Sequence, residues 1–237
     1  KDNTDALSRY IAETKSMGIP VLRPDVNESE ADFTVVRVPA EKEGAEDPKA
    51  VRFGMGAVKN VGEGAVEAIV ESRGEGPYEG IFDYCERVDG KRVNKRVTEA
   101  LIKSGAFDSI ASTLEVTRSQ LMAVLDTAQE RAAAQQRDRD SGQTSLFGML
   151  EEASQAAGQE GGAKEEYPDV PSWAPQMRLA FEKENLGFYV SGHPLDRWTE
   201  DLRRHASATT VKLVELSAGR DVAVGGIIAA YRERPLK

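Results

Sequence analysis

Two glycines, Gly62 and Gly64, stand immediately before a stretch whose apolar residues recur at helical spacing, and together they could bind an anion. Glycines at such a place allow a tight turn with positive φ and leave backbone N–H groups uncovered. Because these N–H groups lie at a helix N-terminus, where the helix dipole is positive, they favour a phosphate group. The alternative interpretation is an ordinary glycine-rich helix start.

A basic cluster follows about thirty residues later. Between residues 87 and 103 there are six basic side chains (Arg87, Lys91, Arg92, Lys95, Arg96, Lys103) against two acidic ones (Asp89, Glu99). Asn94 is a favourable N-cap and Gly105 a favourable residue after a helix end, so the pattern predicts a helix over 95–104. With the short helix predicted at 81–88, this makes a second helix–turn–helix of similar length to the first.

Two turns of this kind in tandem are typical of helix-hairpin-helix modules, whose usual ligand is a nucleic-acid phosphate. The candidate DNA-binding residues are Lys59, Asn60, Gly62, Gly64, Lys91, Arg92, Asn94, Lys95 and Arg96. Phosphate contacts carry no sequence information, so sequence-independent binding of double-stranded DNA is expected. The alternative for the basic cluster is a solvated helix face.

A third candidate site is the pattern Gln-x-x-Leu-Phe, formed by Gln143, Ser145, Leu146 and Phe147 within residues 143–147. Leu146 and Phe147 are large apolar side chains in a polar stretch, and such a pair can fill a pocket on a partner protein. Gln143 offers both a hydrogen-bond donor and an acceptor at the rim of that pocket. The alternative is one helical turn that packs back on its own domain.

Residues suited to covalent or metal chemistry are few. The chain has two histidines, His193 and His205, and one cysteine, Cys85, with no zinc-ligand spacing and no P-loop. His193 has no visible carboxylate or nucleophile as a partner, so a structural role in a turn is expected. Cys85 is expected to be buried and inert. We therefore assign no catalytic residue and no metal ligand.

The remaining patterns predict the elements that position these residues. Polar caps at residues 2–4 and Gly18 predict a helix between them, and alternation predicts a hairpin of 33–38 with 51–53. Helices are also predicted over 118–136, over a stretch with Met177, Ala180 and Phe181 on one face, and from Pro194 onward. Residues 222–228 predict a strand with a glycine bend. The polar, acidic residues 137–170 predict a flexible linker.

Composition limits the functional classes. The chain has 237 residues, a formal net charge of −9, 40% hydrophobic residues and 6% aromatic residues. An acidic chain with one basic cluster suits a module that touches DNA weakly while something else holds it there. There is no apolar run of the ~20 residues that a membrane span needs. A single cysteine excludes an internal disulfide and suits a reducing cytoplasm.

The order of these motifs resembles the C-family replicative DNA polymerases of bacteria, the alpha subunits of DNA polymerase III. The blocks that carry the resemblance are 17–19, 24–27, 59–64, 93–97, 100–108 and 186–194. The resemblance implies a mainly α fold with small β parts (α+β), and a fragment, since no initiator methionine opens the chain. It implies the end of a fingers region at 1–53, a tandem helix-hairpin-helix module at 54–110, a helix at 111–136, the linker at 137–170, a helical segment at 171–218 and the start of a truncated OB-fold at 219–237.

The resemblance also implies a function and partners. The parent protein would be a DNA-directed DNA polymerase that uses Mg²⁺, whereas this fragment would lack the catalytic palm, be inactive alone and hold no cofactor. Its partners would be double-stranded DNA and a sliding clamp bound at 143–147, with other replicative holoenzyme subunits bound through missing regions and no membrane contact. The alternatives are an error-prone paralogue of the same polymerase, a helix-hairpin-helix module of a repair or ligase protein, and a scaffold without DNA affinity.

Overall fold

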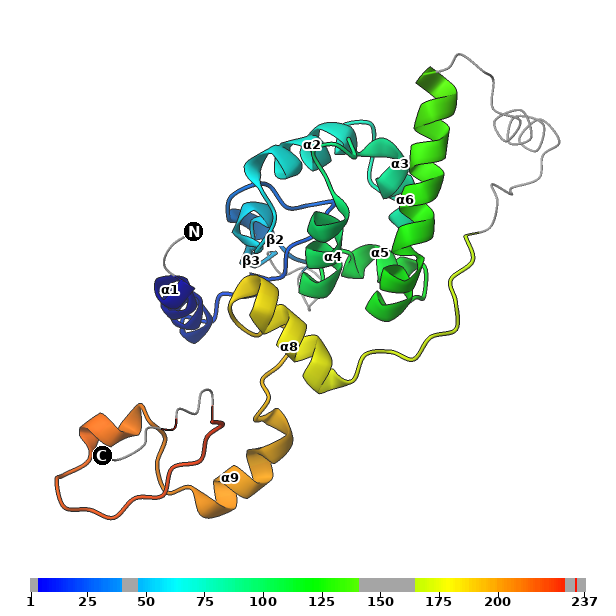
Figure 1. The fold of residues 1–237 in the computed structure, drawn as a ribbon. Helices are drawn as coiled ribbons and strands as arrows, with labels where there is room; N and C mark the ends of the chain where they lie inside the picture. Colours follow the sequence, from blue (N-terminus) through cyan, green and yellow to red (C-terminus); the bar gives the residue numbers. More distant parts are fainter. Residues whose placement is uncertain (1–3, 40–46, 141–164, 229–232, 234–237) are drawn as a thin grey trace. The chain divides into compact units, whose positions relative to one another are not determined.

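The computed structural model describes residues 4–39, 47–140, 165–228 and 233, which fall into two compact units, 1–190 and 191–237 (Figure 1). The described residues are mainly helical with one small sheet, which confirms the predicted α+β class. The helices of the first unit are α1 (Thr4–Ser16), α2 (Glu63–Arg73), α3 (Ile81–Arg87), α4 (Lys95–Ser104), α5 (Asp108–Thr113), α6 (Arg118–Asp140) and α8 (Pro175–Leu186), with a short 3-10 turn, η1 (Met55–Ala57).

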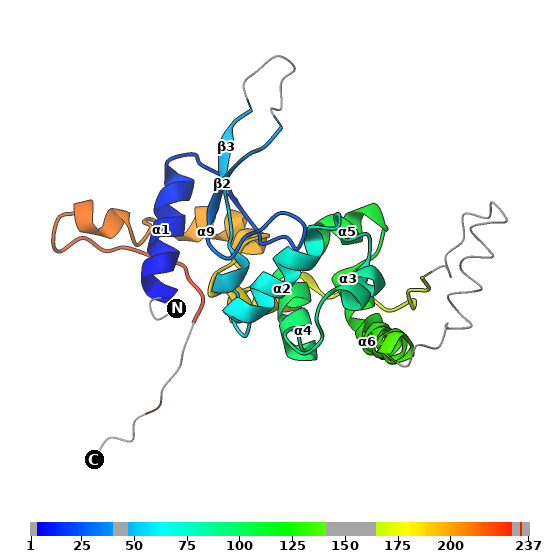
Figure 2. The same cartoon turned by 90° about the horizontal axis from the view of Figure 1, so that it is seen from above.

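The sheet of the first unit has three strands in the order β1-β3-β2: β1 (Val21–Leu22), β3 (Lys49–Arg52) and β2 (Thr34–Arg37). β2 and β3 pair antiparallel with Val35 opposite Val51, as the predicted hairpin requires. The parallel pairing of β1 with β3 was not predicted, because a two-residue strand between Pro20 and Pro24 leaves no alternation to detect. Figure 2 shows this hairpin projecting from the helices.

One hydrophobic core runs through the first unit and holds the helices together. α6 packs on α3 and α4, and α8 packs on α4. Tyr84 and Phe107 lie at its centre, both fully buried, with ring centroids 4.9 Å apart in an edge-to-face arrangement. Leu121 and Leu125 of α6, a helix predicted over 118–136, are also fully buried. The core therefore fixes both loops between helices in which the candidate DNA-binding residues lie.

α8 differs from its prediction in the face that it buries. Met177 is 48% exposed, whereas Leu179, Glu182 and Leu186 are buried. The prediction followed the helical spacing of Met177, Ala180 and Phe181 and missed a charged residue on the buried side. Burial of Glu182 is tolerable because it forms an ion pair with a distant arginine. Gly187 ends the helix with φ +87.

The segment before α8 is partly attached to the core, although little fixed structure was expected over 137–170. α6 continues to Asp140, and the Tyr167 ring lies edge-on to Phe82 with centroids 6.2 Å apart. Trp173 packs against Phe181 of α8 in the same manner, at 4.6 Å. Residues 141–164, which include Gln143, Ser145, Leu146 and Phe147, lie outside the described residues.

The second unit contains η2 (Asp196–Trp198), α9 (Thr199–His205) and η3 (Lys212–Glu215). Its helix begins five residues after Pro194 rather than at it, because Asp196–Trp198 forms a 3-10 turn first. The strand predicted at 222–228 is wrong: these residues have no regular structure. A strand needs a hydrogen-bonding neighbour, and within the described part of this unit Ala223 bonds only to the backbone of Ser207 and Ala208 and to the Ser207 hydroxyl.

Candidate nucleic-acid interface

The first turn, residues 58–62, connects η1 to α2 and is anchored on both sides. Val58 and Val61 are fully buried, so the residues between them are forced outward. Lys59 and Asn60 are exposed, and the Lys59 N–H donates to the carbonyl of Asn185 on α8 at 2.8 Å. Asn60 adopts the left-handed conformation with φ +69, which reverses the chain direction.

The expectation that Gly62 and Gly64 supply positive φ is wrong. Gly62 is the N-cap of α2 with φ −84, and the left-handed residue of the first turn is Asn60. A Cβ atom built on Gly62 or Gly64 would also meet nothing within 4 Å. Neither backbone conformation nor internal packing therefore requires glycine here, and both glycines leave open space over the start of α2.

Open space at this helix start exposes unsatisfied donors. Gly62 provides no side-chain cap, and the first hydrogen bonds of α2 run from Ala65 and Val66 to the Gly62 carbonyl. The N–H groups of Gly62, Glu63 and Gly64 donate to no other residue in the part of the chain that the structure describes. An oxyanion could accept hydrogen bonds from them at the positive end of the helix dipole.

The second turn, residues 88–94, connects α3 to α4 and has the predicted caps. The Asn94 side chain accepts a hydrogen bond from the Val97 N–H at 3.2 Å, and Gly105 ends α4 with φ +86. Asp89 closes the turn, because its carbonyl accepts from Arg92 and Val93 and its side chain accepts from the Lys91 N–H. Unlike Gly62, Asn94 occupies the N-cap with its own side chain, so α4 begins with one donor already satisfied.

The four basic residues of the second turn and α4 start have different surroundings. Arg92 forms ion pairs with Glu67 and Glu71 of α2, at 2.6 and 2.7 Å. Lys95 forms an ion pair with Asp126 of α6. Lys91 and Arg96 are exposed and form no ion pair with any described residue. The structure therefore brings Arg92 and the second turn against α2, but it leaves only part of the basic cluster free for a phosphate.

Three carboxylates that neutralise this cluster were not predicted from the sequence: Glu67, Glu71 and Asp126. Glu67 and Glu71 are four residues apart and so share one face of α2, which is a readable signal for a shared cationic partner. That the partner is Arg92 depends on the packing of the second turn on α2, which the spacing does not reveal. Asp126 carries no such signal.

His193 and Cys85 have the expected structural surroundings. The Nδ1 atom of His193 accepts from the Leu195 N–H at 3.1 Å, and the His193 N–H donates to the Asp196 carboxylate. Burial raises the pKa of the Cys85 thiol to about 12, so it carries almost no thiolate near neutral pH. Among the described residues no three His, Cys, Asp or Glu side chains gather to hold a metal ion.

No helix within the described ranges combines the length and the apolar character needed to cross a membrane.

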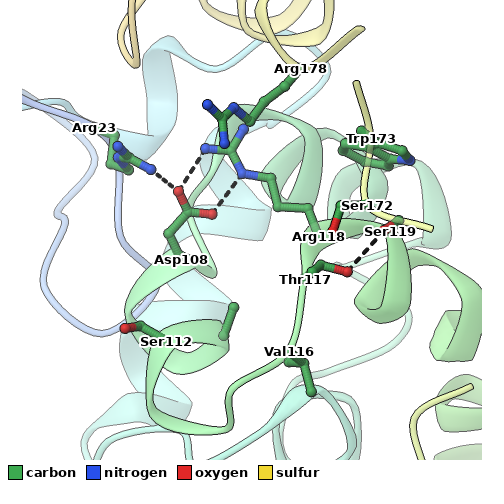
Figure 3. A pocket seen from close by; sticks show the side chains of 11 residues that line it. Arg23, Asp108, Ser112, Val116, Thr117, Arg118, Ser119, Ser172, Trp173 and Arg178 are labelled. Atoms are coloured by element: carbon green, nitrogen blue, oxygen red, sulfur yellow. Dashed lines mark hydrogen bonds and ion pairs between the residues drawn. The ribbon is translucent and has the colours of Figure 1, made fainter. Parts of the chain in front are cut away.

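A pocket not anticipated from the sequence lies at the start of α6 in the first unit. Its lining residues include Arg23, Asp108, Arg118, Trp173 and Arg178, and its volume is about 400 Å³. Figure 3 shows the guanidinium groups of Arg23 and Arg118 at the Asp108 carboxylate and that of Arg178 beside Arg118, each from a separate chain segment. Single arginines scattered over more than 150 residues give no sequence signal for such a convergence.

Comparisons with known proteins agree with this geometry. Residues 18–121 match a family model described as a helix-hairpin-helix motif. The chain is 36% identical over 233 residues to the DNA polymerase III subunit alpha of Vibrio cholerae and 37% identical over 243 residues to that of Pseudomonas aeruginosa. It is 32% identical over 233 residues to the same subunit of Escherichia coli K12. These matches cover 97–98% of this chain but only 18–19% of the relatives, so the chain spans less than a fifth of their length.

Proposed function

Because this chain is related over nearly its whole length to one segment of the DNA polymerase III alpha subunits, we propose that it grips duplex DNA for such a polymerase. The larger protein would carry out template-directed DNA synthesis, with Mg²⁺ held by residues outside this segment, in the bacterial cytoplasm. The single observation that carries the proposal is the helix start at Gly62–Gly64, where bare N–H groups face open space.

Duplex binding through the first turn follows from its shape. Glycine is unnecessary for the fold at residues 62 and 64, yet it is the residue that lets a DNA backbone approach a helix N-terminus closely. Lys59 and Asn60 stand exposed on the same turn and add a cation and an amide beside those donors. Each contact would be to a phosphate oxygen, so the grip is independent of base sequence.

The second turn contributes mainly through Lys91 and Arg96. Both are exposed and unpaired among the described residues, whereas Arg92 and Lys95 are held by carboxylates of α2 and α6. Asn94 positions the start of α4 through its cap rather than facing a ligand directly. The second turn would therefore make fewer phosphate contacts than its six basic neighbours suggest.

The first prediction tests these contacts. Replacing Lys91 and Arg96 together by alanine should weaken binding to any duplex by about tenfold at low salt and reduce the salt slope by about two. Fluorescence anisotropy with two duplexes of unrelated sequence measures both quantities. The matched control replaces Arg9 and Lys15 of α1, which removes the same charge elsewhere. Equal losses in the two double variants would show a general charge effect and refute a site at the second turn.

The second prediction concerns the carboxylates that neutralise Arg92. Changing Glu67 and Glu71 to glutamine removes the carboxylates that bind this guanidinium. Duplex affinity should then rise by about two- to fivefold, which corresponds to the free energy of an exposed ion pair. The salt dependence should become steeper, because one more phosphate is neutralised. The control changes Glu13 and Glu184 to glutamine, which alters net charge equally. If both pairs of changes raise affinity alike, Arg92 has no part in DNA binding.

We also propose a sliding clamp as a partner, bound by residues 143–147. These residues lie outside the described part of the chain, so the support is the Gln-x-x-Leu-Phe pattern and the two attached ends that bracket it. α6 is packed on the core before the segment, and Tyr167 is packed on Phe82 after it. A clamp bound there would keep the helix hairpins near DNA at high effective concentration. Contacts with other holoenzyme subunits would come from the rest of the protein.

A further inference from the structure

The arginine pocket, defined by Arg23, Arg118, Arg178, Asp108 and Trp173, has more positive charge than its carboxylates neutralise. The Arg118 guanidinium binds two carboxylates. Its Nε and Nη2 atoms donate to Asp108, each at 2.6 Å, and its Nη1 atom donates to Glu182 at 3.2 Å. Arg23 shares the same Asp108 carboxylate. Three guanidinium groups thus meet two carboxylates.

Arg178 is the cation left over. It is exposed, it forms no ion pair with any described residue, and Figure 3 shows its side chain reaching toward the guanidinium of Arg118. Two like charges that face one another are unfavourable unless an anion lies between or beside them. The surroundings of Arg23 agree, because burial and the charge of Arg118 lower its pKa.

The remaining walls suit a phosphate ester rather than a bare ion. The pocket lies where α6 begins, so the positive end of that helix dipole adds to the guanidinium charges. Ser112 also lines the pocket and adds a hydroxyl group, whereas the Thr117 hydroxyl already donates to the Gln120 side chain. On the opposite side from the arginines stands the half-buried ring of Trp173 (Figure 3). A volume of about 400 Å³ lies within the range of sites that take small organic ligands.

We propose that this pocket binds a nucleotide phosphomonoester, with the phosphate between Arg23 and Arg178 and the nucleoside toward Trp173. The same chemistry is available from a free nucleoside monophosphate or from the 5′-phosphorylated end of a DNA strand. The site is separate from the two hairpin turns, and it uses residues that no duplex contact proposed above requires.

Tryptophan fluorescence provides a direct measurement. The chain has two tryptophans, so the Trp198→Phe background leaves Trp173 as the only one. dAMP and a 5′-phosphorylated oligodeoxyadenylate are titrated against this protein, beside deoxyadenosine and the 5′-hydroxyl oligonucleotide. The expected result is saturable quenching by at least one phosphorylated ligand and none by its unphosphorylated partner. Response to dAMP alone assigns a free nucleotide, and response to the phosphorylated strand alone assigns a DNA end.

Substitution of Arg178 completes the test. Arg178→Gln should lower the affinity for the phosphorylated ligand by about ten- to a hundredfold, because one charge-assisted contact is lost. Arg178→Lys should retain part of that affinity. Arg9→Gln is the matched control on α1 and should change nothing. Duplex affinity should be unchanged in Arg178→Gln, which separates this site from the hairpins. Equal binding of phosphorylated and unphosphorylated ligands, no binding at millimolar concentration, or unchanged affinity in Arg178→Gln would overturn the proposal.

Discussion

Replacing Arg118 by methionine should lower the free energy of unfolding by about 3–5 kcal/mol, because it leaves a buried carboxylate without its cation. Glu182 is fully buried, and its Oε1 atom lies 3.2 Å from Nη1 of Arg118. Its other oxygen accepts from the Val190 N–H at 3.0 Å. Arg118 itself is 7% exposed, so water cannot take over its role. Equilibrium unfolding in urea, followed by circular dichroism, measures the loss.

The companion variants separate charge from packing. Glu182→Gln keeps the shape of the side chain and leaves Arg118 bound to Asp108. It should therefore lower the free energy of unfolding by less than Arg118→Met does. The double variant Arg118→Met/Glu182→Leu removes both charges and should recover part of the loss, as buried ion pairs replaced by apolar residues often do. Arg131→Met is the control, since Arg131 forms a more exposed ion pair with Glu86. A loss below about 1 kcal/mol for Arg118→Met would mean that Glu182 does not depend on this cation.

This ion pair also connects stability to the proposed DNA interface. α8 packs on α4, and Asn185 near its end accepts the hydrogen bond from Lys59 in the first turn. If Arg118→Met loosens α8, the first turn loses an anchor, although no candidate phosphate contact has been changed. Duplex affinity measured well below the unfolding midpoint should therefore fall modestly in this variant. The effect would be structural, and Glu182→Gln should show it to a smaller extent.

Local signals in the sequence were sufficient for most helix boundaries. Asn94 and Gly105 each act within one turn of α4, and Gly187 acts in the same way on α8, so their roles follow from residue type and position alone. Gly105 has a second role that its position hides, since a Cβ there would lie 2.3 Å from the Arg118 guanidinium. Its glycine is required by both backbone conformation and packing.

The contacts that the sequence did not predict are those between distant segments. From the sequence alone, Glu182 is expected to be an exposed helix residue. It is buried because the fold brings it against Arg118, 64 positions earlier in the chain. Arg92 likewise reads as a free phosphate ligand until the second turn is packed on α2. For Gly62 the predicted reason was wrong, because its φ is −84 and the glycine instead leaves open space at the start of α2. The surroundings of these residues depend on tertiary packing, which the periodicity of the sequence does not reveal.

Under the proposed function, the charge distribution calls for a second point of attachment to DNA. The chain has a net charge of −9, and two of the four basic residues around the second turn are neutralised by neighbouring carboxylates. Few phosphate contacts give weak, salt-sensitive binding, from which a polymerase would dissociate readily. A clamp attached through another segment of the same chain would convert this weak contact into an intramolecular one.

Changing Leu146 and Phe147 together to alanine should therefore weaken clamp binding by about a hundredfold or more, since each buried side chain contributes about 1.5–3 kcal/mol. Calorimetric titration with the sliding clamp measures the change, and the expected wild-type affinity is about micromolar for a short peptide motif. Met149→Ala/Leu150→Ala is the matched control, because it removes two apolar residues of the same segment outside the pattern.

Gln143→Ala should show a smaller loss of clamp affinity, because a rim hydrogen bond contributes less than the apolar pair. Duplex affinity without the clamp should be unchanged in all of these variants, since the proposed duplex contacts are made by other residues. Unchanged clamp affinity in Leu146→Ala/Phe147→Ala, or an equal loss in the control, would remove residues 143–147 as the clamp site and leave the weak duplex grip without a tether.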